Sequence, residues 1–426
     1  MLKRRIVLFL RPGIGLKRWL AILAAGILCF GLGLGFALAT PVSPKVLPLF
    51  RAVTLSGLPA VPRGAVFIGI GTALSGLALW QVYRLIISGA TAGRRKVDML
   101  ASLERQRKQG RGLRVVAIGG GTGLATLLRG LKYETGNLTA IVAITDDGGS
   151  SGRLRRDLRI PPPGDVRNCL VALSEAEPLV ESLFNYRFDG SSSLGGHSLG
   201  NLLIAALYEL GGGFEQSLQL AREFLPIVGQ VVPASSEANL VLMGETVSGQ
   251  VLRGESAIGH APDRLRRVWI EPHGAASATA LEAIRQAELI VIGPGSLYTS
   301  IIPNFLLAGL REAVAASPAP KVFVCNVATQ PHETDAFGPS DHLRVFLDHT
   351  GAAVTHLLVN SRALPLPKGC GQTLVIGEPS IPGFHGTVVL ADVIDESFPT
   401  RHDPRKLASA LLDLARSSRR GVLQTA

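Results

Sequence analysis

Five short apolar runs, each followed at once by a loop of glycine and polar residues, constrain the fold more than any other feature of this sequence. The runs are rich in Val, Ile and Leu, which is typical of strands buried on both faces of a sheet. They occupy residues 113–118, 138–144, 288–293, 321–326 and 355–360. Helix-like segments separate them. This alternation predicts an α/β fold with a mainly parallel sheet covered by helices on both faces.

The loops that follow these runs point to a binding crevice. They read GGGTG, TDDGGSSG, GPGSLYTS, NVATQ and NSR, in chain order. Ligands of open α/β sheets bind beyond the carboxyl ends of the strands. We therefore expect the five loops to converge on one ligand.

The glycine-rich loop Gly119–Gly123 opens a helix directly after the first strand. Glycines let the backbone approach a phosphate, and the helix N-terminus supplies N–H donors. The loop is not a complete dinucleotide fingerprint, because Leu124 stands where the last glycine is required, and it lacks the lysine of a Walker A loop. A tight turn is the structural alternative to ligand contact. The residues predicted to contact a ligand here are Gly120, Gly121, Thr122 and Gly123.

The second loop carries paired acids and hydroxyls. A carboxylate at a strand end can bind sugar hydroxyls or hold Mg²⁺ through water. We predict ligand contacts from Asp146, Ser150 and Ser151, with a solvated turn as the alternative. Further along, Asp165 is expected to be the N-cap of a helix. Arg167 and Asn168 follow in its first turn, where an arginine could bind phosphate through two hydrogen bonds.

Residues 196–200 read GHSLG and match the G-x-S-x-G nucleophile elbow of α/β hydrolases. That elbow needs a strand immediately before the serine, and the preceding residues read as a loop. We therefore interpret Ser198 as the N-cap of the following helix, with His197, Ser198 and Asn201 facing a ligand. A membrane-tethered esterase is the minor alternative.

The loop after the third strand combines glycines with hydroxyls. Gly295, Ser296 and Thr299 are suited to binding oxygen atoms, and Tyr298 could stack on a base or sugar ring. An aromatic at the rim of the site is the alternative role for Tyr298. The histidines show no metal-ligand spacing, and no residue is assigned as a catalytic base.

These motifs together resemble the bacterial gluconeogenesis-factor family, which is related to the 2-phospho-L-lactate transferases of deazaflavin-cofactor synthesis. The resemblance spans residues from about 113 to about 415 and rests on five segments in order: GGGTG, TDDGGSSGRLR, PPGDVRNCLVAL, GHSLGNLLIAAL and GPGSLYTSIIPN. It implies a Rossmann-like three-layer sandwich. It also implies a role in cell shape and envelope precursor supply during gluconeogenic growth, with UDP-N-acetylglucosamine as ligand.

By motif position, the nucleotide-sugar contacts would fall on the GGGTG loop, Asp146, Asn168, Asn201 and the GPGSLYTS loop. Arg401 would add a basic contact to the diphosphate.

Two functional hypotheses follow. In the first, the domain is a non-catalytic regulator that passes ligand occupancy to an envelope-synthesis enzyme. In the second, it is a phosphotransferase of the 2-phospho-L-lactate transferase type, acting on a deazaflavin-like acceptor with Mg²⁺ at Asp146 or Asp147. Mg²⁺ is expected only in the second hypothesis, and no other cofactor is expected. An NAD-dependent dehydrogenase is a distant third reading because the fingerprint is incomplete. Self-association is a further expectation.

Two uncharged stretches of about 20 residues near the N-terminus predict a transmembrane helical hairpin, over residues 19–39 and 64–83. A signal peptide and a buried core helix are the alternatives. Basic residues before the first stretch and after the second place both flanks in the cytoplasm. The expected domains are a membrane anchor (1–88), a basic linker (89–112) and a cytoplasmic α/β domain (113–426). We expect the anchor to insert in the lipid bilayer of the inner membrane.

The formal net charge of +11 does not indicate a nucleic-acid partner. Residues 1–112 hold 17 Lys and Arg against two acids, whereas the remainder is net negative. The basic excess therefore flanks the predicted spans, where anionic lipid would attract it. The four cysteines show no metal-ligand spacing and are expected to be reduced packing residues.

Overall fold

The structure is a computed structural model. It describes residues 22–31, 59–90, 112–190, 194–367 and 369–425. The chain divides into two compact units, Met1–Lys108 and Gln109–Ala426, and each is described by itself.

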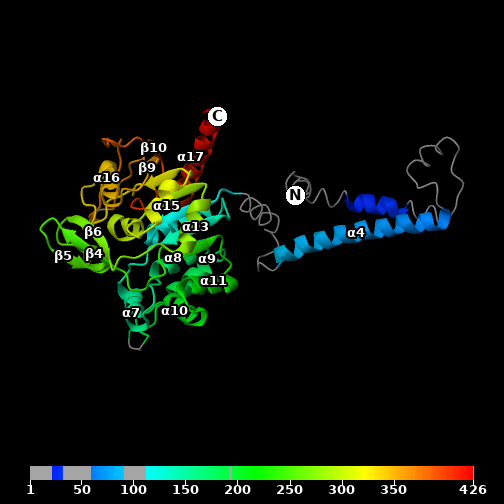
Figure 1. Cartoon of the computed structure of the whole chain (residues 1–426), viewed down its shortest axis with the longest axis horizontal. Coiled ribbons are helices and arrows are strands. Elements are labelled where there is room, and N and C mark those ends of the chain that lie inside the picture. Colours follow the sequence, from blue (N-terminus) through cyan, green and yellow to red (C-terminus); the bar gives the residue numbers. More distant parts are fainter. Residues whose placement is uncertain (1–21, 32–58, 91–111, 191–193, 368, 426) are drawn as a thin grey trace. The chain divides into compact units, whose positions relative to one another are not determined.

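The second unit is built on a seven-stranded sheet in the order β10-β9-β8-β7-β1-β2-β3, and every neighbouring pair is parallel. Figure 1 labels β9 and β10, at one edge of this sheet. Its strands are β1 Val115–Gly119, β2 Leu138–Val142, β3 Gln230–Pro233, β7 Leu289–Ile292, β8 Lys321–Val324, β9 His356–Asn360 and β10 Thr387–Ala391. The predicted parallel α/β sheet is confirmed, and the five expected strands are β1, β2, β7, β8 and β9.

The strand order reverses between β1 and β7. From β1 the chain adds β2 and β3 on one side, and β7, β8, β9 and β10 then extend the sheet on the other side. This is the order of a doubly wound Rossmann-like sheet, in which ligands bind beyond the carboxyl ends of the strands at the reversal. The fold therefore predicts a ligand-binding site at the loops after β1 and β7.

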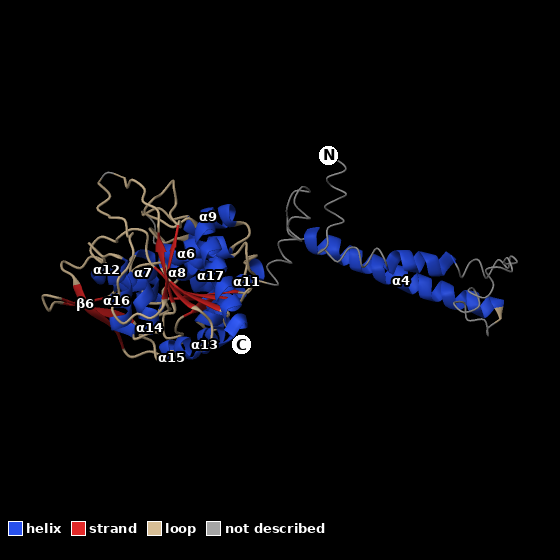
Figure 2. Ribbon diagram, turned by 90° about the horizontal axis from the view of Figure 1, so that it is seen from above, coloured by secondary structure: helices blue, strands red, loops and turns tan. Residues whose placement is uncertain are grey.

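Helices cover both faces of this sheet, as Figure 2 shows with α6 and α9 on one side of the strands and α13 and α15 on the other. The helices are α6 Gly121–Leu131, α7 Gly149–Leu158, α8 Gly164–Leu173, α9 Glu177–Asn185, α10 Leu199–Gly211, α11 Phe214–Phe224, α12 Glu255–Ile258, α13 Ala278–Gln286, α14 Ile302–Phe305, α15 Leu310–Ala316, α16 Pro339–Thr350, α17 Pro404–Thr425 and the one-turn π-helix η1 Leu297–Ile301.

The C-terminal helix α17 packs against α6, the helix that follows the glycine-rich loop. A Cβ added to Gly130 would lie 1.8 Å from the carbonyl oxygen of Pro404, so the two backbones meet where no side chain fits. The segment just before α17 is thereby held near the loop after β1, at the carboxyl ends of the strands. Arg401 and His402 belong to this segment.

A smaller antiparallel sheet in the order β5-β4-β6 was not predicted from the sequence. Its strands are β4 Val241–Thr246, β5 Val251–Arg253 and β6 Leu265–Glu271. The edge strands β3 and β10 were also missed. The strand β3 has only two aliphatic residues, and β10 has an apolar run, VVLA, whose side chains are partly exposed rather than buried as in the central strands.

The first unit contains the long helix α4 (Ala60–Ala90) and the short apolar helix Ile22–Gly31. Residues Gly64–Gln81 of α4 are long and apolar enough to cross a membrane, by length and composition only. The two helices approach closely, since a Cβ on Gly71 would lie 2.7 Å from the backbone nitrogen of Phe30. Residues 19–21 and 32–39 of the first expected span lie outside the described residues, so the membrane hairpin stays a prediction.

Candidate functional site

A cleft of about 480 Å³ lies at the reversal of the sheet, a volume typical of small-molecule sites. It is lined by the loops after β1, β7 and β8, together with the segment before α17. The structure brings eight of the predicted ligand-contact residues into this lining: Gly120, Gly121, Thr122, Gly123, Gly295, Ser296, Thr299 and Arg401.

The loops after β1 and β7 touch each other at glycines. A Cβ on Gly123 would lie 2.5 Å from the carbonyl oxygen of Pro294 and 2.8 Å from the Cα of Gly295. The N-cap residue Gly120 supplies no side-chain cap to α6. The first turn of this helix lines the cleft, and its Gly121 N–H donates to the Asp165 carboxylate. Backbone N–H groups at a helix N-terminus favour anionic oxygen.

The loop after β8 holds the loop after β7 in place. Asn326 Oδ1 accepts from the Gly295 backbone N–H at 3.2 Å, and Asn326 Nδ2 donates to the Gly295 carbonyl at 2.8 Å. One residue further, Ser296 is the N-cap of η1, and its hydroxyl oxygen accepts from the Thr299 N–H. Single π-helical turns are frequent at functional sites.

A buried carboxylate, Glu333, lies beside this loop. The hydroxyl of Ser296 donates to both carboxylate oxygens, at 2.8 and 2.6 Å, and Gln330 Nε2 donates to Oε1 at 2.9 Å. Burial raises the pKa of Glu333 to about 7, although the Ser296 hydroxyl and the Tyr298 N–H both favour the ionised form. Ser296 and Gln330 line the cleft, so Glu333 supports two of its groups.

A second set of predicted residues forms a buried polar network next to the cleft. Arg167 Nη1 donates to Ser198 Oγ at 2.8 Å and to Asn201 Oδ1 at 3.0 Å, while Nη2 donates to Asn168 Oδ1 at 2.9 Å. This arginine is buried rather than on the surface. Its guanidinium therefore connects α8 with the start of α10.

The same network reaches the start of α7. Asn201 Nδ2 donates to Ser150 Oγ at 3.1 Å, and Ser150 Oγ lies 3.0 Å from His197 Nδ1. Ser151 is also buried, and its hydroxyl bonds the carboxylate of Asp146. Asp146 also accepts from the Gly148 N–H at 2.8 Å, and desolvation raises its pKa.

Asp165 connects the network to the cleft, and its expected role as an N-cap is wrong. The N-cap of α8 is Pro163, and Asp165 lies within the first turn. Its carboxylate accepts from the Gly121 N–H, and a Cβ on Gly120 would lie 2.5 Å from its Oδ2. Desolvation, reinforced by the charge of Asp146, raises the pKa of Asp165 to about 7.

The interpretation of Ser198 as an N-cap is confirmed, because its side chain accepts from the Asn201 N–H. Ser198 forms only an isolated antiparallel bridge with Arg187 and does not follow a strand of the sheet. Its hydroxyl receives a hydrogen bond from Arg167. The strand-to-helix turn that a nucleophile elbow requires is absent at this serine.

Tyr298 lies outside the cleft. Its side chain is 2% exposed, and its ring makes an edge-to-face contact with His349 at 5.6 Å. Burial raises its pKa to about 12. The structure therefore places this ring in the core, where it supports η1, and not where it could stack on a base.

Two further acids, Asp147 and Glu255, lie where the loop after β2 meets α12 of the small antiparallel sheet. Asp147 Oδ1 accepts from the Ser256 N–H at 2.8 Å, which ties the loop after β2 to α12. Glu255 on α12 lines the cleft, and burial together with Asp165 and other nearby acids raises its pKa well above the usual range. Among the described residues, no group of three or more His, Cys, Asp or Glu could hold a metal ion.

At the rim, Arg401 is exposed and no carboxylate of the described residues forms an ion pair with it. Its neighbour His402 is buried, and its Nε2 donates to the Cys325 carbonyl at 3.2 Å. Burial lowers the pKa of His402 to about 4, so the ring is neutral. Arg401 therefore supplies positive charge to the cleft, whereas His402 is structural.

Sequence reasoning named the loop after β8 but assigned no residue in it. The cleft residues that it missed include Asn326, Gln330, Glu255 and, beneath them, Glu333. The motif NVATQ at a strand end was a usable signal for Asn326 and Gln330. Glu255 had none, because a different sheet carries it to the cleft.

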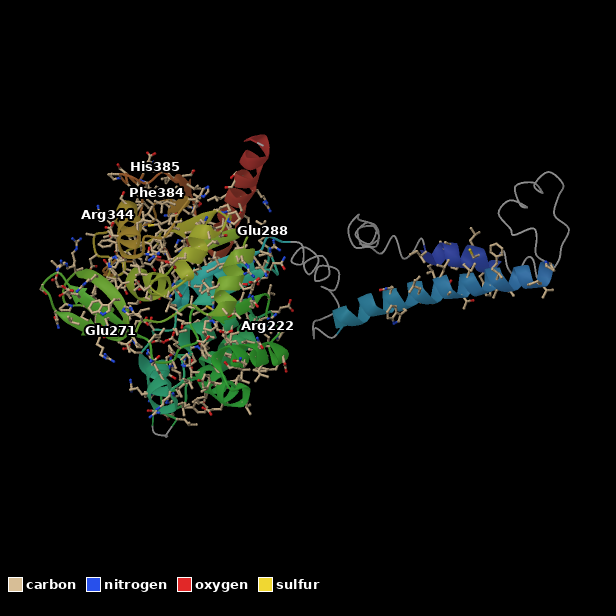
Figure 3. All side chains as sticks on the ribbon, viewed as in Figure 1. Arg222, Glu271, Glu288, Arg344, Phe384 and His385 are labelled. Atoms are coloured by element: carbon tan, nitrogen blue, oxygen red, sulfur yellow. The ribbon has the colours of Figure 1, made fainter. Side chains whose placement is uncertain are left out.

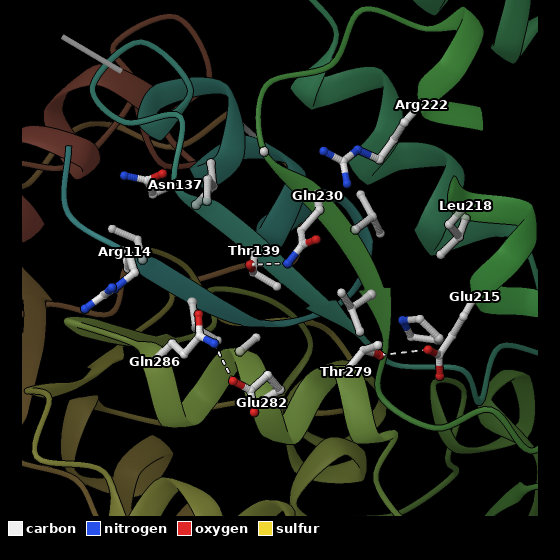
Figure 4. A pocket seen from close by; sticks show the side chains of 18 of the residues that line it. Arg114, Asn137, Thr139, Glu215, Leu218, Arg222, Gln230, Thr279, Glu282 and Gln286 are labelled. Atoms are coloured by element: carbon white, nitrogen blue, oxygen red, sulfur yellow. Dashed lines mark hydrogen bonds between the residues drawn. The ribbon is translucent and has the colours of Figure 1, made fainter. Parts of the chain in front are cut away.

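A larger cavity of about 720 Å³ lies at the other end of the strands, between α11, α13 and β3 (Figure 4). Its walls carry amides and charged side chains, including Gln230, whose Nε2 donates to Thr139 Oγ1 at 3.0 Å. Arg222 on α11 is exposed at its rim (Figure 3). This cavity lies at the amino ends of β1 and β2. Ligands of open α/β sheets bind beyond the carboxyl ends of the strands, so the smaller cleft is the better candidate for the ligand site.

Comparison with known proteins gives the family. A sequence profile described as 2-phospho-L-lactate transferase CofD matches residues 115–370. The gluconeogenesis factor of Halalkalibacterium halodurans is 45% identical over 308 residues, which cover 70% of this chain and 95% of that protein. The gluconeogenesis factor of Bacillus subtilis is 43% identical over 310 residues, covering 71% of this chain and 98% of its own.

A longer relative from Nostoc sp., named for the same family, is 37% identical over 423 residues, which cover 95% of this chain and 91% of its own. The crystal structure of a UPF0052 family member from Bacillus halodurans has a TM-score of 0.66 and 42% identity, and covers 71% of this chain and 99% of that one. Both the sequence and the fold thus match across the α/β unit. The chain belongs to the gluconeogenesis-factor family, which is related to the CofD transferases.

Proposed function

We propose that the cleft binds a nucleotide sugar, UDP-N-acetylglucosamine, and that the domain is a regulator of cell shape and envelope precursor supply during gluconeogenic growth. The observation that carries this proposal is the meeting of two glycine-rich loops at the reversal of the sheet, with Arg401 at the rim. The first turn of α6 and the Arg401 guanidinium are complementary to a diphosphate.

The polar network beside the cleft supports binding rather than acyl transfer. Ser198, the serine of the G-x-S-x-G match, has its hydroxyl engaged by Arg167 and by the Asn201 backbone. It is a helix cap in a loop, without the geometry of an activated nucleophile. A binding regulator needs only the oxygen-binding loops, and these are what line the cleft.

The test is thermal unfolding of the full chain, purified in detergent, with and without UDP-N-acetylglucosamine. Ligand at 100 times its dissociation constant should stabilise the protein by about 2.7 kcal/mol. Arg401→Ala should weaken binding, whereas Arg405→Ala, an exposed arginine on α17 outside the cleft lining, should not. A Tm unmoved by UDP-sugars but raised by a deazaflavin would reject the proposal.

A Mg²⁺-dependent transferase of the 2-phospho-L-lactate type is the second candidate, favoured by the profile match over residues 115–370. Mg²⁺ usually binds one or two carboxylates together with substrate phosphates, so a group of three protein ligands is not required. Asp146 or Asp147, in the loop after β2, would hold the ion. Asp146→Asn should then abolish turnover of a phospho-lactyl donor with a deazaflavin acceptor while nucleotide binding remains.

The N-terminal segment extends the proposal to localisation. We propose that α4 and the helix Ile22–Gly31 anchor the chain in the inner membrane, with the α/β unit in the cytoplasm near a membrane-bound envelope-synthesis enzyme. Such a tether would raise the local concentration of the domain at its partner. Deleting residues 1–88 should release the protein from the membrane fraction, and unchanged fractionation would refute the anchor.

A further inference from the structure

A chain of three oxygen-bearing side chains leads from the buried Glu333 to the cleft. Ser296 Oγ lies 2.6 Å from Glu333 Oε2 and 2.7 Å from Thr299 Oγ1. Ser296 and Thr299 both line the cleft, although Thr299, like Glu333, is only 4% exposed. Each hydroxyl has one proton to donate, so the protonation state of the carboxylate decides which way both hydroxyls point.

When Glu333 is ionised, it can only accept. Ser296 must then donate its proton to the carboxylate, and its oxygen accepts from the Thr299 N–H at 3.2 Å. The Thr299 hydroxyl completes the chain by donating to Ser296. In this state the Thr299 hydroxyl can only accept a hydrogen bond from the cleft. An anionic ligand oxygen has no proton to donate, so it cannot bond to this hydroxyl.

When Glu333 is protonated, the chain reverses. Gln330 Nε2 donates to Oε1, so Oε1 stays an acceptor and the added proton belongs on Oε2, the oxygen nearer Ser296. Glu333 then donates to Ser296, and Ser296 donates to Thr299. The Thr299 proton is released to donate to a ligand oxygen in the cleft.

We propose that Glu333 is a positioning residue that takes up one proton when a phosphate oxygen of the ligand binds at Thr299. The proton comes from solvent and rests on Glu333 Oε2, and no covalent bond changes. This inference rests on the proposed function in one respect, namely that the ligand of the cleft carries a phosphate.

The charges around Glu333 are compatible with this role. Glu255 on α12 and Glu333 repel each other, and the Tyr298 N–H of η1 bonds the carboxylate. Gln330, on the same segment as Glu333, is a neutral hydrogen-bond partner of the carboxylate. The side chains of His332 and Asp335 on that segment are exposed. Because burial brings the pKa of Glu333 to about 7, one proton can be gained near neutral pH.

Isothermal titration of the full chain with UDP-N-acetylglucosamine tests this directly, in buffers of different ionisation enthalpy. This ligand has no phosphate group that titrates near pH 8, so proton uptake reports on the protein. At pH 8 we expect uptake of about one proton per ligand, and an affinity that falls roughly tenfold per pH unit above pH 7.

Glu333→Gln should abolish the uptake and flatten the pH profile, because the amide oxygen can accept from Gln330 while the amide nitrogen donates to Ser296. Thr299→Ser should keep the uptake, and Thr299→Val should lose it. Asp348→Asn, which removes an exposed carboxylate of α16 outside the cleft lining, should leave it intact. Uptake that survives in Glu333→Gln or Thr299→Val, or that is lost in Asp348→Asn, would overturn the inference.

A failure of the nucleotide sugar to bind is distinguishable. Inorganic sulfate, which does not titrate near neutral pH, then serves as the probe, and its stabilisation of the full chain is followed against pH. If sulfate raises the Tm more at pH 6.5 than at pH 8, and Glu333→Gln removes the difference, the proton-linked chain stands although the nucleotide-sugar proposal fails. If neither sulfate nor UDP-N-acetylglucosamine binds, both proposals fail.

Discussion

Gly123 on α6 lies directly against the backbone of Pro294, which follows β7. This contact joins the first strand of the sheet to the strand across the reversal, although 171 positions separate the two residues along the chain. It has room for a hydrogen atom and not for a methyl group, since a Cβ there would come within 2.5 Å of the Pro294 oxygen. The shape of the cleft depends on this approach of two backbones.

We therefore expect Gly123→Ala to push the two loops apart. The cost should be about 1–3 kcal/mol of unfolding free energy, the usual penalty for overpacking, with a loss of ligand binding of at least about tenfold. Gly190→Ala is the matched control, because a Cβ there meets nothing within 4 Å. Thermal unfolding and UDP-N-acetylglucosamine titration of both variants measure the difference. Equal behaviour would contradict the close approach.

The pair of hydrogen bonds between Asn326 and Gly295 predicts a second effect. Asn326→Ala leaves one partly buried donor and one partly buried acceptor of the loop backbone unpaired, which should cost about 1 kcal/mol and weaken ligand binding. Asn326→Asp keeps the acceptor for the Gly295 N–H but places a second acceptor against the Gly295 carbonyl. We expect it to bind ligand worse than the wild type at pH 8. A wild-type dissociation constant in both variants would argue against the clamp.

Arg167 should not tolerate lysine. Its two terminal nitrogens hold Ser198, Asn201 and Asn168 at once, and an ammonium group cannot reproduce that planar arrangement. Arg167→Lys should lower the unfolding free energy by about 2–4 kcal/mol through unpaired buried groups. Arg156→Lys on α7 is the control, since that arginine is exposed. Unfolding by heat in detergent would compare the two.

The raised pKa of Asp165 predicts that stability falls as pH rises. The folded carboxyl holds its proton up to about pH 7, whereas the unfolded one releases it near pH 4. The folded state therefore binds more protons within this window, and the destabilisation is complete above pH 7. Glu333 acts in the same direction.

Asp165→Asn should accordingly have a shallower fall in Tm between pH 5 and pH 8, and should be more stable than the wild type at pH 8. One kcal/mol corresponds to about 2–4 °C in a unit of this size. Asp348→Asn, an exposed change on α16, should keep the wild-type slope. The Asp165 assignment fails if both variants follow the wild-type curve.

Features set by neighbours in the chain could be predicted from the sequence. The central strands follow from continuous apolar runs such as LIVI in β7, because a strand buried on both faces tolerates little else. The cap at Ser198 spans only three residues to Asn201. The glycine-rich loop after β1 could also be predicted, because a backbone that must approach another group needs residues without a Cβ.

Tertiary structure alone decided which polar groups meet. Asp165 has the sequence context of a cap, yet its carboxylate accepts from Gly121, which lies on a different helix. Glu333 and Ser296 are 37 positions apart, and nothing in either segment announces their contact. Tyr298 could have faced the ligand or the core with the same neighbours in sequence. The physical reason is that burial and long-range hydrogen bonds depend on how the sheet reverses, and that reversal is a property of the whole chain.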